Sequence, residues 1–202
     1  MASRYGVLGS YNNGIMRVAR ACPNRISMFS WIVTTFWMLM GRAGPRDLTS
    51  SQSVIVQAAI VYTLVSITDA ALVFQRPTAI LFGFADLAYT SAAVALCLGV
   101  RRRLHRLQQT LLAILGVGSW LTLPSILTNG WIQLTQIADH PVTAPLGLQL
   151  LLAGVLASSI LIVGRILRDA LDVELFTGIT VSMTYFLLNY CLLIAIPSRL
   201  FT

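Results

Sequence analysis

Two aspartates, Asp69 and Asp86, fall inside long apolar stretches of the sequence. Ionising a carboxylate in hydrocarbon is costly, so an aspartate there is by default a candidate functional group, able to bind a proton or a cation. Both lie roughly five to eight residues from the turn between their stretches, which predicts similar depth on adjacent helices, near Thr68, Tyr89 and Thr90. The alternative is structural, in that each aspartate hydrogen-bonds to another helix or reaches the outer interface.

Other chemistry finds little support in the sequence. A serine nucleophile such as Ser119 needs a base beside it, but the only two histidines, His105 and His140, fall in loops expected on opposite faces of the membrane. The histidines and acids show no metal-ligand spacing, and the three cysteines show no Cys-x-x-Cys spacing. The sequence therefore predicts no catalytic residue, no metal, no cofactor and no enzymatic activity.

Composition indicates the surroundings in which these aspartates lie. The chain has 202 residues, of which 56% are hydrophobic and 10% charged, with a mean hydropathy of +0.78. This predicts an all-α integral membrane protein. The net charge of +7 comes entirely from arginines divided among short polar segments. That pattern suits anionic phospholipid headgroups and excludes the continuous basic surface that nucleic acid requires.

Apolar stretches of the required length predict a membrane domain over residues 42–202. Pro124 lies near the middle of the third stretch, where it frees the carbonyl of Trp120 and predicts a helix kink. Asn129-Gly130-Trp131 is typical of a helix end at the membrane interface. We expect five spans, over residues 54–74, 79–100, 110–130, 146–167 and 177–197.

The amino-terminal part differs from these spans. Residues 1–25 are polar and arginine-rich, without a secretory signal; a mitochondrial transit peptide, or a true start at Met28, are alternatives. Residues 26–41 reach only about 24 Å, short of a roughly 30 Å hydrocarbon core. Their aromatic residues recur at helical spacing, while Thr34 and Thr35 fall elsewhere. We expect an amphipathic interfacial helix, with a short sixth span as the alternative.

An arginine-rich segment between the second and third spans predicts the orientation. It contains Arg101, Arg102, Arg103 and Arg106. Arginines in short loops favour the cytoplasmic side, which places this segment, Arg165 and Arg168 inside. The amino terminus is then cytoplasmic and the carboxyl terminus outside, provided that residues 26–41 do not cross. Beyond topology, the segment is a candidate site for lipid headgroups or for a partner.

Two further groups of residues are candidates for packing and pairing. The segment from Arg165 to Glu174 mixes charges at helical spacing, which predicts local ion pairs, with a partner-docking face as the alternative. Small residues favour close helix contacts in lipid at Gly116, Gly118 and Ser119, and again at Gly154, Ala157, Ser158 and Ser159.

The polar junctions resemble those of small bacterial membrane proteins, and the overall layout resembles the Yip family. The similar stretches are Arg42-Ala-Gly-Pro-Arg-Asp-Leu, Asp86-Leu-Ala, Leu107-Gln-Gln-Thr-Leu-Leu-Ala-Ile-Leu-Gly and Gly164-Arg-Ile-Leu-Arg-Asp-Ala-Leu, within a likeness over most of residues 40–200. The resemblance implies membrane organisation and partner binding, with vesicle traffic in eukaryotes and an inner-membrane location in bacteria. It supplies no catalytic residue.

These features together predict a non-enzymatic integral membrane protein of Yip-like type. We expect it to bind partner proteins or organise the bilayer, in contact with anionic phospholipids. The expected protein partner is either another membrane protein or a second copy of this chain. Binding of nucleic acid is not expected. One alternative is an ion- or proton-coupled transporter subunit that uses Asp69 and Asp86. Another is an accessory subunit of a membrane enzyme complex.

Overall fold

The computed structural model describes residues 28–48, 51–74, 76–137 and 145–200, and every regular element among them is helical. The all-α prediction is confirmed for this part of the chain, whereas residues 1–27 and the loop with His140 lie outside it. The α-helices are α2 (Met28–Leu39), α3 (Gln52–Val73), α4 (Arg76–Val100), α5 (Leu107–Ile137), α6 (Leu146–Leu171) and α7 (Leu175–Leu200), with 3-10 turns η1 (Pro45–Asp47) and η2 (Leu104–Arg106).

In the part of the chain that the structure describes, four stretches of helix are long and apolar enough to cross a bilayer, which indicates a membrane-embedded protein. They are Gln52–Val73, Pro77–Val100, Leu104–Leu134 and Leu146–Leu171. Helix α2 is shorter, with 12 residues, and so is the part of α7 with described side chains, Leu175–Cys191.

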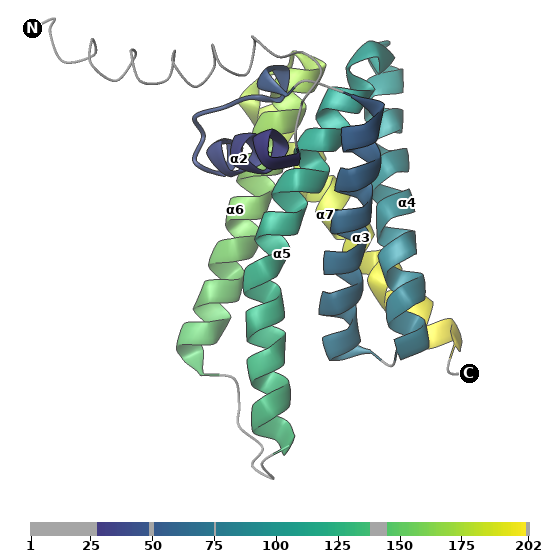
Figure 1. Cartoon of the computed structure of the whole chain (residues 1–202), viewed down its shortest axis with the longest axis vertical. Coiled ribbons are helices and arrows are strands. Elements are labelled where there is room, and N and C mark those ends of the chain that lie inside the picture. The colour runs from purple at the N-terminus through teal and green to yellow at the C-terminus, as the bar shows by residue number, and fades with distance from the viewer. Residues whose placement is uncertain (1–27, 49–50, 75, 138–144, 201–202) are drawn as a thin grey trace, which may run out of the picture.

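The long helices alternate in direction along the chain (Figure 1). The α4–α5 and α6–α7 junctions lie at one end of the bundle, and the α3–α4 turn lies at the other. Helix α2 lies across α5 and α6 near the first end instead of running beside them. All eight arginine side chains that the structure describes belong to segments at this end, which we call the arginine end: Arg42, Arg46, Arg101, Arg102, Arg103, Arg106, Arg165 and Arg168.

Helix α2 is held against α5 by its buried face. The Trp31 indole Nε1 donates a hydrogen bond to the carbonyl of Leu112 at 3.3 Å. Beside it, a Cβ on Gly116 would lie 2.3 Å from the Thr35 methyl, so only glycine permits this approach. Thr35 is fully buried, and its hydroxyl donates to the carbonyl of Trp31. The threonine expected away from the apolar face therefore contacts the protein core.

Helix α5 is longer than its sequence predicted. It has 31 residues, about 46 Å, and continues through both Pro124 and Gly130. The predicted end at Asn129-Gly130-Trp131 is wrong, because the Asn129 amide serves a contact with α3 described below. Pro124 lies inside one continuous helix.

The predicted small-residue contacts divide into two groups. Gly116 and Gly118 of α5 do pack closely, since a Cβ on Gly118 would lie 2.8 Å from the Tyr62 ring. On α6, in contrast, a Cβ on Gly154 would meet no described atom within 4 Å. The close contact of α6 with α7 depends on Gly164 and Gly178, where a Cβ on Gly178 would lie 2.4 Å from the Gly164 carbonyl oxygen.

Candidate functional site

Asp86 lies in α4 and is the centre of a hydrogen-bond network between three helices. Its side chain is buried. The carboxylate Oδ2 accepts from the Tyr62 hydroxyl at 2.7 Å and from the Ser66 hydroxyl at 3.1 Å, both on α3. Its Oδ1 accepts from the Asn189 amide of α7 at 3.1 Å. These bonds join α4 to α3 and α7, helices far apart in sequence, and all three donors are uncharged.

Asp69 of α3 has a separate set of donors, all on α5. The Ser125 hydroxyl lies 3.1 and 3.2 Å from its two carboxylate oxygens, and the Asn129 amide donates to Oδ1 at 3.0 Å. One turn further along α5, the Gln133 amide donates to the backbone carbonyl of Leu72. Ser125, Asn129 and Gln133 recur every four residues on one face of α5. This polar stripe is visible in the sequence, but its contact with α3 was not predicted.

The two aspartates lie at different depths. Because Asp86 bonds to both Tyr62 and Ser66, its level on α3 is near residue 64, five positions from Asp69. At 1.5 Å per residue this places Asp86 about 7 Å further from the α3–α4 turn. No hydrogen bond joins these two described carboxylates. Each carboxylate instead accepts hydrogen bonds from side chains of other helices, which is the structural alternative to a shared ion site.

Both carboxylates nevertheless line one cavity of about 220 Å³ within the bundle. Its lining is rich in polar side chains from five helices: Tyr62, Ser66, Asp69, Asp86, Thr122, Ser125, Ser159, Tyr185 and Asn189. The rest of the lining is mainly apolar and includes Phe82, Ile114 and Phe186, and a cavity of this size has room for several water molecules. The arrangement could hold a proton or a cation between acidic and neutral oxygens.

The three residues expected to assist the aspartates have different roles. Thr68 is exposed, and its hydroxyl donates to the Leu64 carbonyl of its own helix. The Tyr89 hydroxyl donates to the backbone carbonyl of Tyr185 at 2.8 Å, and the Thr90 hydroxyl shares a hydrogen bond with the Tyr185 hydroxyl at 2.8 Å. Tyr89 and Thr90 therefore fix Tyr185 of α7, which lines the cavity, and Thr68 does not belong to it.

A second acidic centre, Asp172, lies at the arginine end. It ends α6 in the left-handed conformation, with φ of 50°. Its carboxylate accepts from Arg46 at 3.0 Å, from Arg103, and from Arg106 at 3.3 Å. The hydrogen bond from Arg103, with help from Arg106, lowers the pKa of Asp172 below its ordinary value. Among the described side chains, the predicted local pairing is seen for Arg168 with its neighbour Asp169, at 2.9 Å, whereas Asp172 binds arginines from other segments.

The arginine-rich segment divides into two pairs. Arg103 and Arg106 bind Asp172, and Arg106 also donates to the Asp169 carbonyl at the end of α6, 3.1 Å away. Arg101 and Arg102 are exposed and form no ion pair with any residue that the structure describes. One pair thus joins helix ends, and the other is free to meet molecules outside the protein.

The fold and these two centres define a helical membrane-embedded protein. Within the described ranges, no group of three or more His, Cys, Asp and Glu side chains could hold a metal ion. Comparisons with protein-family models, with curated proteins and with solved structures found no match to the chain.

Proposed function

We propose that this chain is a non-enzymatic integral membrane protein of Yip-like layout, whose arginine end contacts anionic phospholipids and thereby organises the bilayer or partner proteins. In this proposal α3 to α7 are five spans and α2 lies in the interface. The observation that carries it is the position of α2, which lies across the bundle at the end where the described arginines gather (Figure 1).

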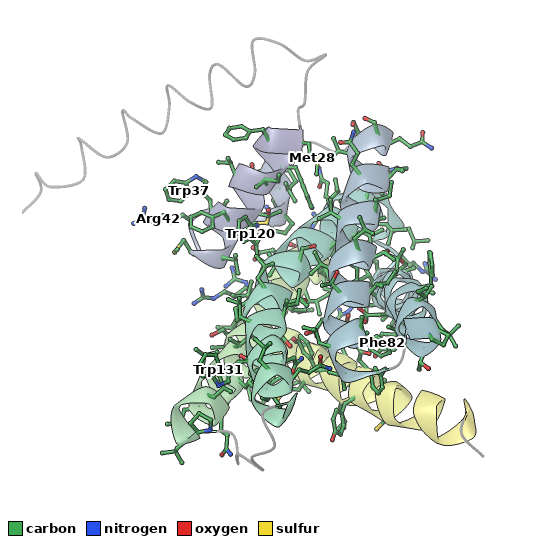
Figure 2. All side chains as sticks on the ribbon, turned by 60° about the horizontal axis from the view of Figure 1, so that its bottom comes forward. Met28, Trp37, Arg42, Phe82, Trp120 and Trp131 are labelled. Atoms are coloured by element: carbon green, nitrogen blue, oxygen red, sulfur yellow. The ribbon has the colours of Figure 1, made fainter. Side chains whose placement is uncertain are left out.

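The outer face of α2 supports an interfacial position. Phe29 is 73% exposed and Met40 59%, while Phe36 and Trp37 are also exposed. The Arg42 guanidinium lies 5.3 Å from the centre of the Trp37 ring, and Figure 2 shows these two residues side by side. A short helix with exposed aromatics on one side and a cation at its end is typical of the boundary between headgroups and acyl chains.

The unpaired arginines support contact with anionic lipid. Arg101 and Arg102 project from the α4–α5 junction, and each arginine near an anionic surface contributes about 1 kcal/mol of attraction. Arginine-rich short loops favour the cytoplasmic face, so this end is cytoplasmic and the carboxyl terminus lies outside, in a bacterial inner membrane under the Yip-like proposal.

The experiment compares thermal stability in nanodiscs of phosphatidylcholine with nanodiscs that also contain phosphatidylglycerol. Anionic lipid should raise the unfolding midpoint of the wild type, and the double variant Arg101→Gln/Arg102→Gln should lose much of that increase. Arg199→Gln is the control, since it removes a charge from the end of α7. Equal effects of the control and the double variant would contradict the proposal.

A second candidate function is a proton- or cation-coupled transporter subunit, favoured by the cavity that Asp69 and Asp86 both line. An intramembrane carboxylate facing a polar cavity is the usual arrangement of an ion site. Flux measured in proteoliposomes under a pH or sodium gradient tests it. Flux by the wild type that Asp69→Asn or Asp86→Asn abolishes, with folding intact, would favour this function over the first.

The proposed partner, another membrane protein or a second copy, has a suitable surface on α6. Gly154, Ala157 and Ser158 are exposed on one side of this helix, beside Leu150 and Leu161. Small residues allow helices to approach closely in lipid, so this side suits a further helix. Disulfide cross-linking of Ala157→Cys in membranes tests contact with a second copy.

A further inference from the structure

A cleft at the arginine end lies between α6 and the elbow that joins α2 to η1. It has a volume of about 330 Å³. One part of its lining is apolar, formed by Met38, Ile162 and Ile166, and another part is charged, formed by Arg165, Arg168 and Asp169. The elbow backbone over residues 41–45 closes one side. The cleft is therefore amphipathic, with a cationic part next to an apolar part.

The elbow conformation brings Arg165 into this cleft. Gly41 has φ of +68°, which favours glycine, and the position of a Cβ on it would lie 3.2 Å from Arg165 Nη1. The absent side chain thus leaves the guanidinium room against the elbow. Gly44 has φ of −118°, an ordinary extended conformation, and a Cβ there would approach only Asp169 Oδ2, at 3.8 Å.

The charges in the cleft do not cancel. Arg168 pairs with Asp169, which also lines the cleft, at 2.9 Å. Arg165 is exposed and forms no hydrogen bond or ion pair among the contacts of the described side chains, so one positive charge lacks a counterpart. A guanidinium with free donors beside a second one suits the oxygens of a phosphate group.

Helix α6, which contributes Ile162 and Ile166 to the cleft, has an exposed apolar surface beside them. Leu161, one residue before the cleft-lining Ile162, is 50% exposed, and α6 is the least buried of the four candidate spans. In the proposed orientation the cleft lies at headgroup depth beside α2. A chain that left its apolar part would pass onto the exposed apolar side of α6.

We propose that this cleft binds one anionic phospholipid, with the headgroup phosphate at Arg165 and Arg168 and the upper acyl carbons against Met38, Ile162 and Ile166. The inference rests on the proposed membrane orientation, and it replaces general attraction to the anionic surface with one defined site. Charge complementarity selects an anionic lipid, and the apolar lining selects a lipid over a soluble phosphate.

The test measures binding of phosphatidylglycerol to the purified full chain in detergent by native mass spectrometry. The variants Arg165→Gln, which removes the free charge, and Gly44→Leu, which fills the cleft at constant charge, should each weaken binding of the first lipid about fivefold or more. The matched controls are Arg199→Gln, at the end of α7, and Gly130→Leu, where no described atom lies within 4 Å of a Cβ. Circular dichroism and size exclusion check that each variant folds.

Three outcomes would overturn the site. They are binding of phosphatidylcholine as tight as that of phosphatidylglycerol, competition by glycerol 1-phosphate as effective as that by the lipid, and wild-type binding by both cleft variants. If the cleft variants bind normally while Arg101→Gln/Arg102→Gln reduces stabilisation by anionic nanodiscs, the cleft proposal fails and the proposed function stands. If the cleft variants and Arg101→Gln/Arg102→Gln all respond to anionic lipid as the wild type does, both proposals fail.

Discussion

Asp86 and Asp172 each accept three side-chain donors, but the donors differ in kind. Around Asp172, at the exposed end of α6, they are three guanidinium groups. Around the buried Asp86 they are two hydroxyls and an amide. Ion pairs form at little cost in water but contribute little, whereas inside a bundle the desolvation of a second charge is costly and neutral donors are preferred. Whether an aspartate lies in water or inside the bundle therefore decides whether its hydrogen-bond donors are charged or neutral.

The two centres should also contribute differently to the stability of the folded protein. The network of Asp86 joins α3, α4 and α7 through a buried side chain inside the bundle. The ion pairs of Asp172 join η1, the α4–α5 junction and α6 at an exposed site, where water can replace a lost partner. Removing the buried carboxylate should therefore cost much more than removing the exposed one.

The largest effect is expected from Asp86→Leu. It leaves the donors Tyr62, Ser66 and Asn189 without their acceptor and should lower the free energy of unfolding by about 2–3 kcal/mol, measured in mixed detergent micelles. Asp86→Asn should lose less, because it keeps one acceptor oxygen. A value for Asp86→Leu within experimental error of the wild type would show that the network does not hold the helices together.

The next effect concerns the position of α2. Gly116→Ala places a methyl group against Thr35, at a position 2.3 Å from its Cγ2, and should destabilise the protein by about 1–3 kcal/mol. Limited proteolysis after α2 should accelerate as the helix separates from α5. Gly130→Ala is the control and should leave both measurements unchanged. Equal results for the two variants would mean that α2 does not pack on α5 as described.

A smaller effect is expected at Asp69, which is half-buried. A double-mutant cycle of Asp69→Ala and Ser125→Ala should give a coupling energy of about 1 kcal/mol, the usual size of a hydrogen bond between membrane helices. The same cycle with Thr68→Ala, whose hydroxyl bonds within its own helix, should give none. Coupling at Thr68 equal to that at Ser125 would argue against the α3–α5 contact.

The smallest effect belongs to Asp172 and depends on pH. Its pKa is lowered in the folded protein by the hydrogen bond from Arg103, so its contribution is fully present above its ordinary pKa of about 3.9. The contribution is lost as the pH falls through the lowered value. A wild-type decline in unfolding midpoint below about pH 4 should be weaker in Asp172→Asn, and added salt should reduce the difference. An identical acid decline in the variant would contradict this role.

The sequence predicted helix type and position well because apolar length and polar junctions are local properties. It placed both aspartates inside helices and predicted that the first apolar helix is short, as α2 is with 12 residues. It did not predict that α5 passes Gly130, because the Asn129 amide bonds to Asp69 on another helix. Nor did it predict the arginines around Asp172, which come from segments 126 and 69 residues away. Such contacts depend on the register between helices, which one sequence does not contain.

Labelling single cysteines in intact cells with a membrane-impermeant maleimide tests the central claim most directly. After the native cysteines are replaced by serine, cysteines introduced at Ser10, Ala43, Arg102 and Thr202 report the side of each segment. If α2 lies in the interface at the arginine end, the first three are protected from outside and only Thr202→Cys is labelled. Labelling of Ser10→Cys together with protection of Ala43→Cys and Arg102→Cys would show that α2 crosses the membrane and would contradict the account.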